Sequence, residues 1–226
     1  TAQPYSAENP FLTGGQLLLN SSWNKRLSTS AGLAILGITG ADALGKLARP
    51  YGNQGNTRDP ITTAPTYAFS PLVASASTTY RLDEMPLYPG AFPIRIGGEY
   101  MYNSGAPAAA DNYGYNVGIQ FGKAGKKGTW ELSYTWKWLG ANAWYEELVD
   151  SDFGALYQQT QPNSGFLGPN YGSGTDVKGN VVKLAYSPYD FVTVSAKWFY
   201  TWLIVQYPDG SDSSMSRLQL DATIKF

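Results

Sequence analysis

The sequence predicts an all-β protein made of antiparallel strands, and two patterns support this prediction. Polar and apolar residues alternate over long stretches, most clearly in the last ten residues, RLQLDATIKF. Successive side chains of a strand point to opposite faces, so such a stretch forms a strand with one apolar and one polar face. The connections alternate too, with short turns near residues 25, 85, 125 and 189 and longer loops near residues 50, 108, 160 and 209. Both patterns are typical of an antiparallel transmembrane β-barrel, whose apolar face meets lipid.

Nine strands are expected in this chain, most of them ~9–12 residues long, which is enough for a tilted strand to cross a bilayer. The alternative for any one of them is a half-exposed strand of a soluble β-sandwich. That alternative predicts mixed polarity on the exposed face and no rhythm in the connections. The expected strands cover about residues 16–23, 27–38, 67–80, 92–103, 113–122, 129–138, 180–187, 192–202 and 217–226.

The first three strands combine an apolar face with a polar face of small residues. Leu17 and Leu19 share a face in the first strand, and Leu33 and Ile35 in the second. The polar faces of the second and third strands are mostly serine, threonine and glycine. Residues 1–15 are rich in Pro, Gly, Asn and Ser and are expected to form a loop. Within the polar connection 39–66, residues 41–47 are expected to form a helical turn.

The next three strands show the clearest alternation. In residues 113–122, large apolar side chains alternate with Gly, Asn and Gln, and in residues 129–138 three tryptophans, a tyrosine and a leucine share one face. Aromatic residues gather near strand ends, as in the interfacial girdles of membrane barrels. The residues concerned are Tyr100, Tyr102, Tyr113, Tyr115, Trp136, Trp138, Tyr200 and Trp202.

The last three strands follow the longest connection, about residues 140–179, in which residues 141–148 favour a short helix. Residues 187–190 form a tight turn between the seventh and eighth strands. The eighth strand sets Val, Ala, Trp and Tyr against Thr, Ser and Lys, with Phe199 as the one large residue on the polar face. The last strand ends on an aromatic residue, Phe226.

The composition excludes several kinds of site. The chain has 226 residues with no cysteine and no histidine, so disulfides, thiolate metal sites, histidine bases and the usual zinc sites are excluded. A net charge of −1 argues against a nucleic-acid partner. We therefore expect no enzyme, no cofactor and no metal. The 17 Tyr, 9 Phe and 7 Trp are the residues that membrane interfaces select.

An odd number of strands leaves two explanations open, because single-chain bacterial barrels have an even number. Either one strand is miscounted, or residues 1–226 are the carboxyl-terminal portion of a larger barrel. We favour the second explanation, a barrel of ~16 strands whose upstream strands lie on the same or another chain.

The polar faces of the strands supply the candidate functional residues. In a barrel these side chains point into the lumen, and charges of both signs there must be hydrated or paired. Four acidic residues in the longest loop are candidates for a constriction of the channel or for a weak calcium site, with a solvated loop helix as the alternative: Glu146, Glu147, Asp150 and Asp152. The principal pore-lining candidates are Arg95, Glu99, Gln120, Glu131, Lys137, Lys183, Lys197, Arg217, Asp221 and Lys225.

Three segments resemble the porin family of Gram-negative outer-membrane β-barrels. They are WKWLGANAWYEELVDSDFG at residues 136–154, GTDVKGNVVKLAYSP at residues 174–188 and the terminal RLQLDATIKF. Members of that family are longer than this chain. The resemblance implies an outer-membrane location, contact with lipid and a homotrimer. It also makes Phe226 the signal read by the assembly machinery.

The function expected from these observations is that of a porin, a water-filled channel for passive diffusion of small hydrophilic solutes. Charges of both signs in the lumen fit such diffusion, and no strong ion preference can be read from the sequence. A plugged structural or adhesive barrel, whose extracellular loops bind a partner, is the alternative. A barrel enzyme with carboxylates at the rim is disfavoured by the missing histidine.

Overall fold

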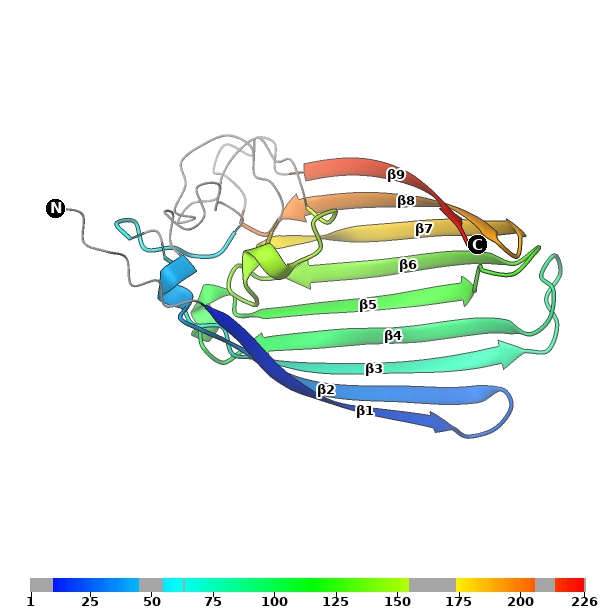
Figure 1. Cartoon of the computed structure of the whole chain (residues 1–226), viewed down its shortest axis with the longest axis horizontal. Helices are drawn as coiled ribbons and strands as arrows, with labels where there is room; N and C mark the ends of the chain where they lie inside the picture. Colours follow the sequence, from blue (N-terminus) through cyan, green and yellow to red (C-terminus); the bar gives the residue numbers. More distant parts are fainter. Residues whose placement is uncertain (1–9, 45–54, 63, 155–173, 206–213, 226) are drawn as a thin grey trace.

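The structure is a computed structural model that describes residues 10–44, 55–62, 64–154, 174–205 and 214–225. These residues form one sheet of nine antiparallel strands in sequence order (Figure 1). The expected number of strands is therefore confirmed. The strands are β1 (Phe11–Ser22), β2 (Leu27–Thr39), β3 (Pro71–Leu82), β4 (Phe92–Asn103), β5 (Tyr113–Gly122), β6 (Trp130–Leu139), β7 (Val177–Tyr189), β8 (Val192–Leu203) and β9 (Ser214–Ile224).

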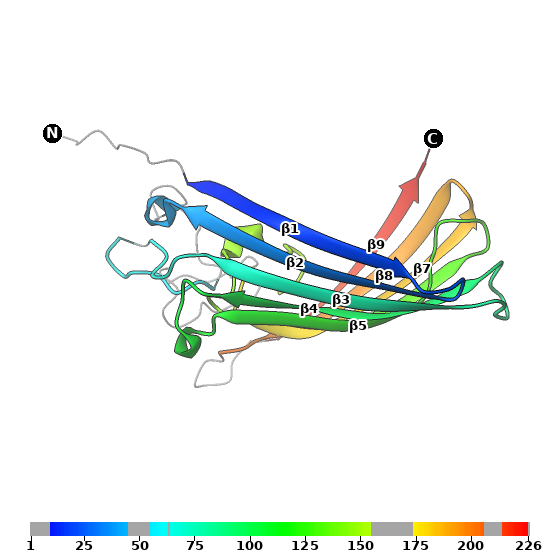
Figure 2. The same cartoon turned by 90° about the horizontal axis from the view of Figure 1, so that it is seen from below.

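The sheet is strongly curved, and β1–β5 and β7–β9 form the two walls of a trough (Figure 2). Within the described residues β1 pairs with β2 alone and β9 with β8 alone, so the sheet is open. Because the number of strands is odd, Phe11 and Ile224 lie at opposite ends. The short turns gather at one end of the trough, the turn end, and the long connections at the other, the loop end (Figure 1).

Two strand boundaries differ clearly from the sequence-based expectation. β1 begins at Phe11, so the prediction that residues 1–15 form a loop is wrong for its last five residues; residues 1–9 lie outside the described part. Gly14 and Gly15, which suggested a loop, pair with Leu36 and Ile35 of β2. In contrast, β3 begins only at Pro71, because Phe69 forms a single bridge to Ile38 and is fully buried among the loops.

Among the described residues the helical segments are three short 3₁₀ helices, η1 (Ala41–Leu44), η2 (Ala108–Ala110) and η3 (Glu146–Leu148). Residues 41–44 of the helical turn expected over residues 41–47 are helical, and the rest of that turn lies outside the described residues. Of the expected helix over residues 141–148, only the last three residues are helical. None of the helices in the described ranges has the length and apolar character needed to cross a membrane.

The buried core lies at the loop end rather than between layers. Phe69 packs against Trp144 and Tyr145, with ring centroids 6.3 and 5.5 Å apart, and Leu44 completes this cluster. Four buried asparagines connect the surrounding loops, because the side-chain amide of each donates a hydrogen bond to a backbone carbonyl of another segment. They are Asn56, Asn103, Asn112 and Asn142.

Candidate functional site

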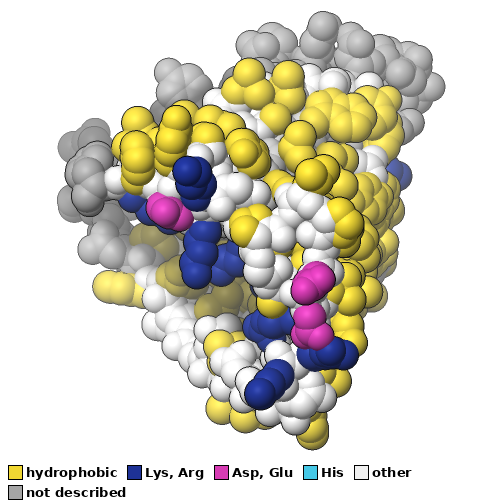
Figure 3. Space-filling view, turned by 90° about the vertical axis from the view of Figure 1, so that its right-hand side faces the viewer, with side chains coloured by type: hydrophobic (Ala, Val, Ile, Leu, Met, Phe, Trp, Pro, Cys, Tyr) yellow, Lys and Arg dark blue, Asp and Glu magenta, His cyan; other side chains and the backbone are white. Residues whose placement is uncertain are grey.

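The two faces of the sheet differ in chemistry. Leu218 and Leu220 of β9 are 64% and 73% exposed on the convex face, where Leu184, Val117 and Ile96 are also exposed. The concave face carries the polar side of each strand. Figure 3, viewed from the turn end, shows Lys and Arg side chains in the hollow and hydrophobic side chains over the outside. The concave face is therefore the candidate site.

Strand register places six of the polar residues of the concave face at one level. Each residue pairs with the next across the neighbouring strands, from β4 to β9. Five strand spacings of ~4.8 Å make this row ~24 Å long. We call it the basic row, and it consists of Arg95, Gln120, Ser133, Lys183, Lys197 and Gln219.

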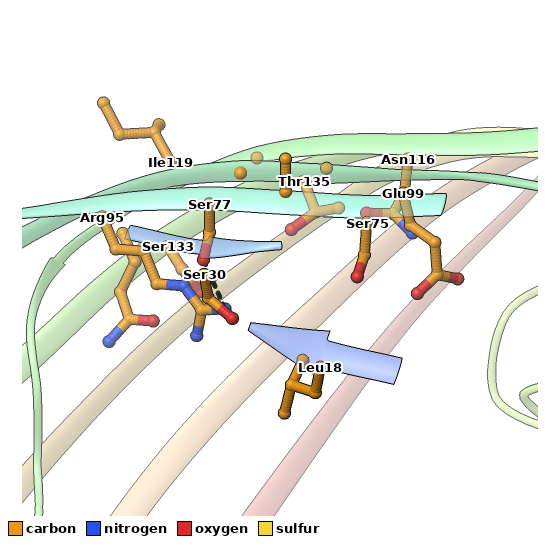
Figure 4. Close-up of a pocket in the computed structure, with 15 residues that line it drawn as sticks. Leu18, Ser30, Ser75, Ser77, Arg95, Glu99, Asn116, Ile119, Ser133 and Thr135 are labelled. Carbon is orange, nitrogen blue, oxygen red and sulfur yellow. Dashed lines mark hydrogen bonds between the residues drawn. The ribbon is translucent and has the colours of Figure 1, made fainter. Parts of the chain in front are cut away.

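Small residues on β2–β5 leave a hollow of about 510 Å³ beside the basic row. Ser30, Ser77 and Gly97 are paired across three strands in its floor. Arg95 donates from Nη2 to the Ser77 hydroxyl at 3.1 Å. Figure 4 shows Arg95, Ser30 and Ser77 at one end of the hollow and Glu99 at the other, whereas Ile119 points away. The hollow therefore offers both signs of charge and several hydroxyls.

The longest loop sends residues 150–153, the docked segment, onto the concave face of β6–β9. Phe153 is 3% exposed and packs against Val177, Phe199 and Leu203, and this explains the large residue on the polar face of β8. Two ion pairs flank this contact. Lys137 Nζ lies 3.1 Å from Asp150 Oδ2, and Arg217 Nη2 lies 2.9 Å from Asp152 Oδ1.

The charge state of Asp150 follows from these contacts. Burial opposes its ionisation, but the ion pair with Lys137, the N–H of Asp152 and the more distant charge of Lys197 together lower the pKa of Asp150. The carboxylate is thus ionised at neutral pH. Two of the four constriction candidates, Asp150 and Asp152, therefore lie on the concave face.

Glu146 has a different environment, buried among the loops at the loop end of the trough. Its carboxylate is buried, accepts hydrogen bonds from the Arg58 guanidinium (3.0 Å from Nε) and accepts another from the Asn56 N–H at 2.7 Å. Burial raises the pKa of Glu146, while Arg58 and the Asn56 N–H act in the opposite direction. This pair joins the loop before β3 to the loop after β6. Glu147 lies next to it in η3 and is half-buried.

Asp176 is a buried carboxyl that sequence analysis did not single out. It immediately precedes β7, and its carboxylate oxygens accept hydrogen bonds from the Val205 N–H at 3.2 and 3.3 Å. Burial raises the pKa of Asp176 to about 8, against the lowering effect of that hydrogen bond. The residue joins the ends of two loops, and no periodicity in the sequence marks it.

The remaining sequence-predicted residues occupy several positions. Lys183 Nζ pairs with Glu131 Oε1 at 2.8 Å, and Asp221 accepts a hydrogen bond from Gln219 at 3.1 Å. Lys225 follows β9 and is exposed. Phe226, the candidate assembly signal, lies outside the described residues. Across the described ranges no group of three or more His, Cys, Asp or Glu side chains is placed to hold a metal ion.

Aromatic side chains of the convex face lie near both ends of the strands. At the loop end Tyr115 stacks on Trp138 with ring centroids 6.4 Å apart, and Trp202 lies at the same level two strands away. At the turn end Trp130 and Tyr186 are paired across β6 and β7. The nine residues from Trp130 to Trp138, or eight steps of ~3.4 Å, span ~27 Å along the strand.

Comparison with known proteins adds no family to this picture. No protein-family model matches the chain, and no curated protein matches it. The fold and the candidate site together define a class by geometry: an open, curved antiparallel sheet with a polar, charged concave face and an apolar, aromatic-rich convex face.

Proposed function

We propose that the chain forms part of the wall of an outer-membrane porin, a water-filled channel for passive diffusion of small hydrophilic solutes. The observation that carries this proposal is that one curved sheet has an apolar convex face and a polar, charged concave face. Leucines that are 64% and 73% exposed at the convex face are costly in water, at ~25 cal/mol per Å² of apolar area, and stable in lipid. The concave face needs water for its charges.

The open edges support a wall completed by further strands. Both β1 and β9 present unpaired backbone groups on one side, and such groups must be paired within a bilayer, where no water is available. Strands on the same or another chain would close the barrel, at ~16 strands for an aqueous channel. A homotrimer remains part of this proposal through the resemblance to porins.

The ends of the sheet support one orientation in a bacterial outer membrane. Barrels of that membrane have short periplasmic turns and long extracellular loops. The turn end of this sheet, where β9 ends, would face the periplasm. The buried loops around Glu146 and Asn56 would face outwards, and their compact hydrogen bonding suits an exposed surface.

Planar-bilayer recording tests the proposal. The natively assembled protein, extracted with detergent, is added to a lipid bilayer in about 1 M KCl. At this concentration the Debye length is ~3 Å, so surface charges are screened. Stable open steps are expected. Quantitative extraction by aqueous buffer without detergent would contradict the membrane location, and a silent but inserted barrel would contradict the channel.

A plugged structural or adhesive barrel is the second candidate, and one observation favours it. The docked segment occupies part of the concave face, with Phe153 buried against β7 and β8. In a plugged barrel that coverage would extend across the lumen. The size of the open step in the bilayer experiment separates a narrowed channel from a closed one.

A further inference from the structure

The basic row contains charge of one sign only. Arg95 on β4 is separated by the neutral Gln120 and Ser133 from the adjacent Lys183 and Lys197, and the neutral Gln219 follows on β9. The same register continues through Thr79 to the small residues of β2 and β1, again without a carboxylate. The described residues at this register therefore include three cations and no carboxylate.

Ion pairing removes some positive charges of the concave face and leaves others. Lys183 is paired with Glu131, and the docked segment pairs with Lys137 and Arg217. In the part of the chain that the structure describes, Arg95 and Lys197 have no carboxylate oxygen within 4.0 Å. These two cations are available to a solute.

The nearest unpaired carboxylates are at other levels. Glu99 lies four residues along β4 from Arg95, or ~13 Å, towards the loops, and Asp221 lies two residues along β9 from Gln219, or ~7 Å, towards the turns. Both distances are comparable to the screening length at physiological salt, ~8 Å. An anion at Arg95 thus meets Glu99 only across about one screening length of water, whereas at the β9 end Asp221 contacts the row directly, because its Oδ1 accepts a hydrogen bond from Gln219 Nε2 at 3.1 Å.

We propose that the basic row is an anion-recognising level of the channel, selective for small solutes that bear carboxylate or phosphate groups. This inference rests on the proposed porin function. Rings of Arg and Lys select anions in pores, and the planar guanidinium of Arg95 matches both oxygens of a carboxylate or phosphate. The docked segment lies on the loop side of Lys197, close enough for the positive charge of Lys197 to contribute to the lowered pKa of Asp150.

The hollow beside Arg95 has room for such a solute. Its volume of about 510 Å³ falls within the ~300–1,000 Å³ typical of small-molecule sites. Hydroxyls of Ser30, Ser77 and Ser133 line it next to the guanidinium, and glycines at Gly97 and Gly118 keep its floor low. These hydroxyls replace water around the parts of the solute that carry no charge.

The test measures the reversal potential across a bilayer under a roughly tenfold KCl gradient. It compares the wild-type channel with the Arg95→Gln and Lys197→Gln variants. The wild-type channel is expected to pass chloride in preference to potassium. Each variant is expected to lower the chloride-to-potassium permeability ratio by ~2–4-fold, the effect of one hydrated charge a few ångströms from the ion. Added potassium phosphate is expected to reduce the wild-type chloride current more than the variant currents.

Two controls isolate the position of the charge. Lys178→Gln removes a lysine from the convex face, where Lys178 lies over the Trp138 ring at 4.9 Å, and it should leave the ratio unchanged. Lys25→Gln removes an exposed lysine from the turn between β1 and β2, outside the basic row, and should also leave the ratio unchanged. A channel that prefers potassium, or whose ratio is unaffected by Arg95→Gln and Lys197→Gln, overturns the inference and leaves the porin function standing. The absence of any conductance overturns the porin function, and the inference with it.

Discussion

Phe153 is expected to hold the docked segment on the concave face, and Phe153→Ala should release it. The side chain is 3% exposed among Val177, Phe199 and Leu203. An aromatic side chain buries ~150–250 Å², which corresponds to ~4–6 kcal/mol at ~25 cal/mol per Å² as an upper bound. Replacing a core Phe by Ala costs ~3–5 kcal/mol.

The flanking ion pairs contribute less than Phe153. The Lys137 and Asp150 side chains are 30% and 44% exposed, and the Arg217 and Asp152 side chains are 36% and 30% exposed. Pairs with this exposure are worth ~0–1 kcal/mol each. We therefore expect Phe153→Ala to release the segment more completely than the Asp150→Asn/Asp152→Asn double variant.

Spin labels measure the release directly, because the chain has no cysteine. Labels at Ser151→Cys and at Asn24→Cys in the turn between β1 and β2 should give one narrow distance in the otherwise wild-type protein. Phe153→Ala should broaden that distribution and enlarge the conductance step. Phe191→Ala, at a side chain 53% exposed, is the matched control and should change neither. A narrow, unshifted distribution in Phe153→Ala would refute the assignment of Phe153 as the main anchor.

Three further predictions concern the loops and the convex face. Glu146→Gln leaves the Arg58 charge buried and should lower stability by ~3–5 kcal/mol, measured by heat-dependent gel mobility; an unchanged transition would contradict the role of this pair. The pKa of Asp176 is raised to about 8, so the folded state favours its protonated form; its stabilisation is complete below ~pH 4 and is lost as pH rises from there through about 8. The temperature of the heat-dependent gel-mobility transition should fall over that range in wild type and change less in Asp176→Asn, and equal profiles would argue against the assignment. Leu220→Lys, on the convex face, should cost up to ~2–4 kcal/mol and impair membrane assembly, whereas Gln219→Lys on the concave face should not; equal yields would exclude lipid contact at this strand.

The approximate position of each strand along the sequence was predictable, because period-two alternation depends only on the residues of that strand. The stretch from Tyr113 to Phe121 alternates large apolar residues with Gly, Asn and Gln, and only an extended strand separates these onto two faces. Boundaries were less predictable where pairing with a distant strand decided them. Gly14 and Gly15 favour a loop locally, and their hydrogen bonds to β2 outweigh that preference.

The sequence predicted which residues lie on the polar face of each strand, but not which of them lie next to one another or form ion pairs. Alternation assigned Arg95, Lys183 and Lys197 to the polar face, and strand register then placed all three at one level. Register depends on how far each strand is shifted against its neighbour. The short turn between β7 and β8 constrains that shift, but an irregularity between Tyr186 and Tyr189 changes it, and the longer connections leave it open. The acidic residues of the longest loop looked alike in sequence, and yet Asp150 and Asp152 reach the concave face while Glu146 is buried with Arg58.

The sequence by itself determined that the chain forms antiparallel strands with one apolar and one polar face, because that information is local to each strand. It also determined, through the absence of histidine and cysteine, which chemistries are excluded. Only the tertiary structure decided which cations lie side by side and which are neutralised, because Lys137 and Asp150 are brought together by the folding of a loop back across the sheet. The tertiary structure also decided that β1 and β9 lie at open edges. Every isolated strand has unpaired backbone groups on both sides, so only the pairing in the sheet shows which strands keep one side unpaired.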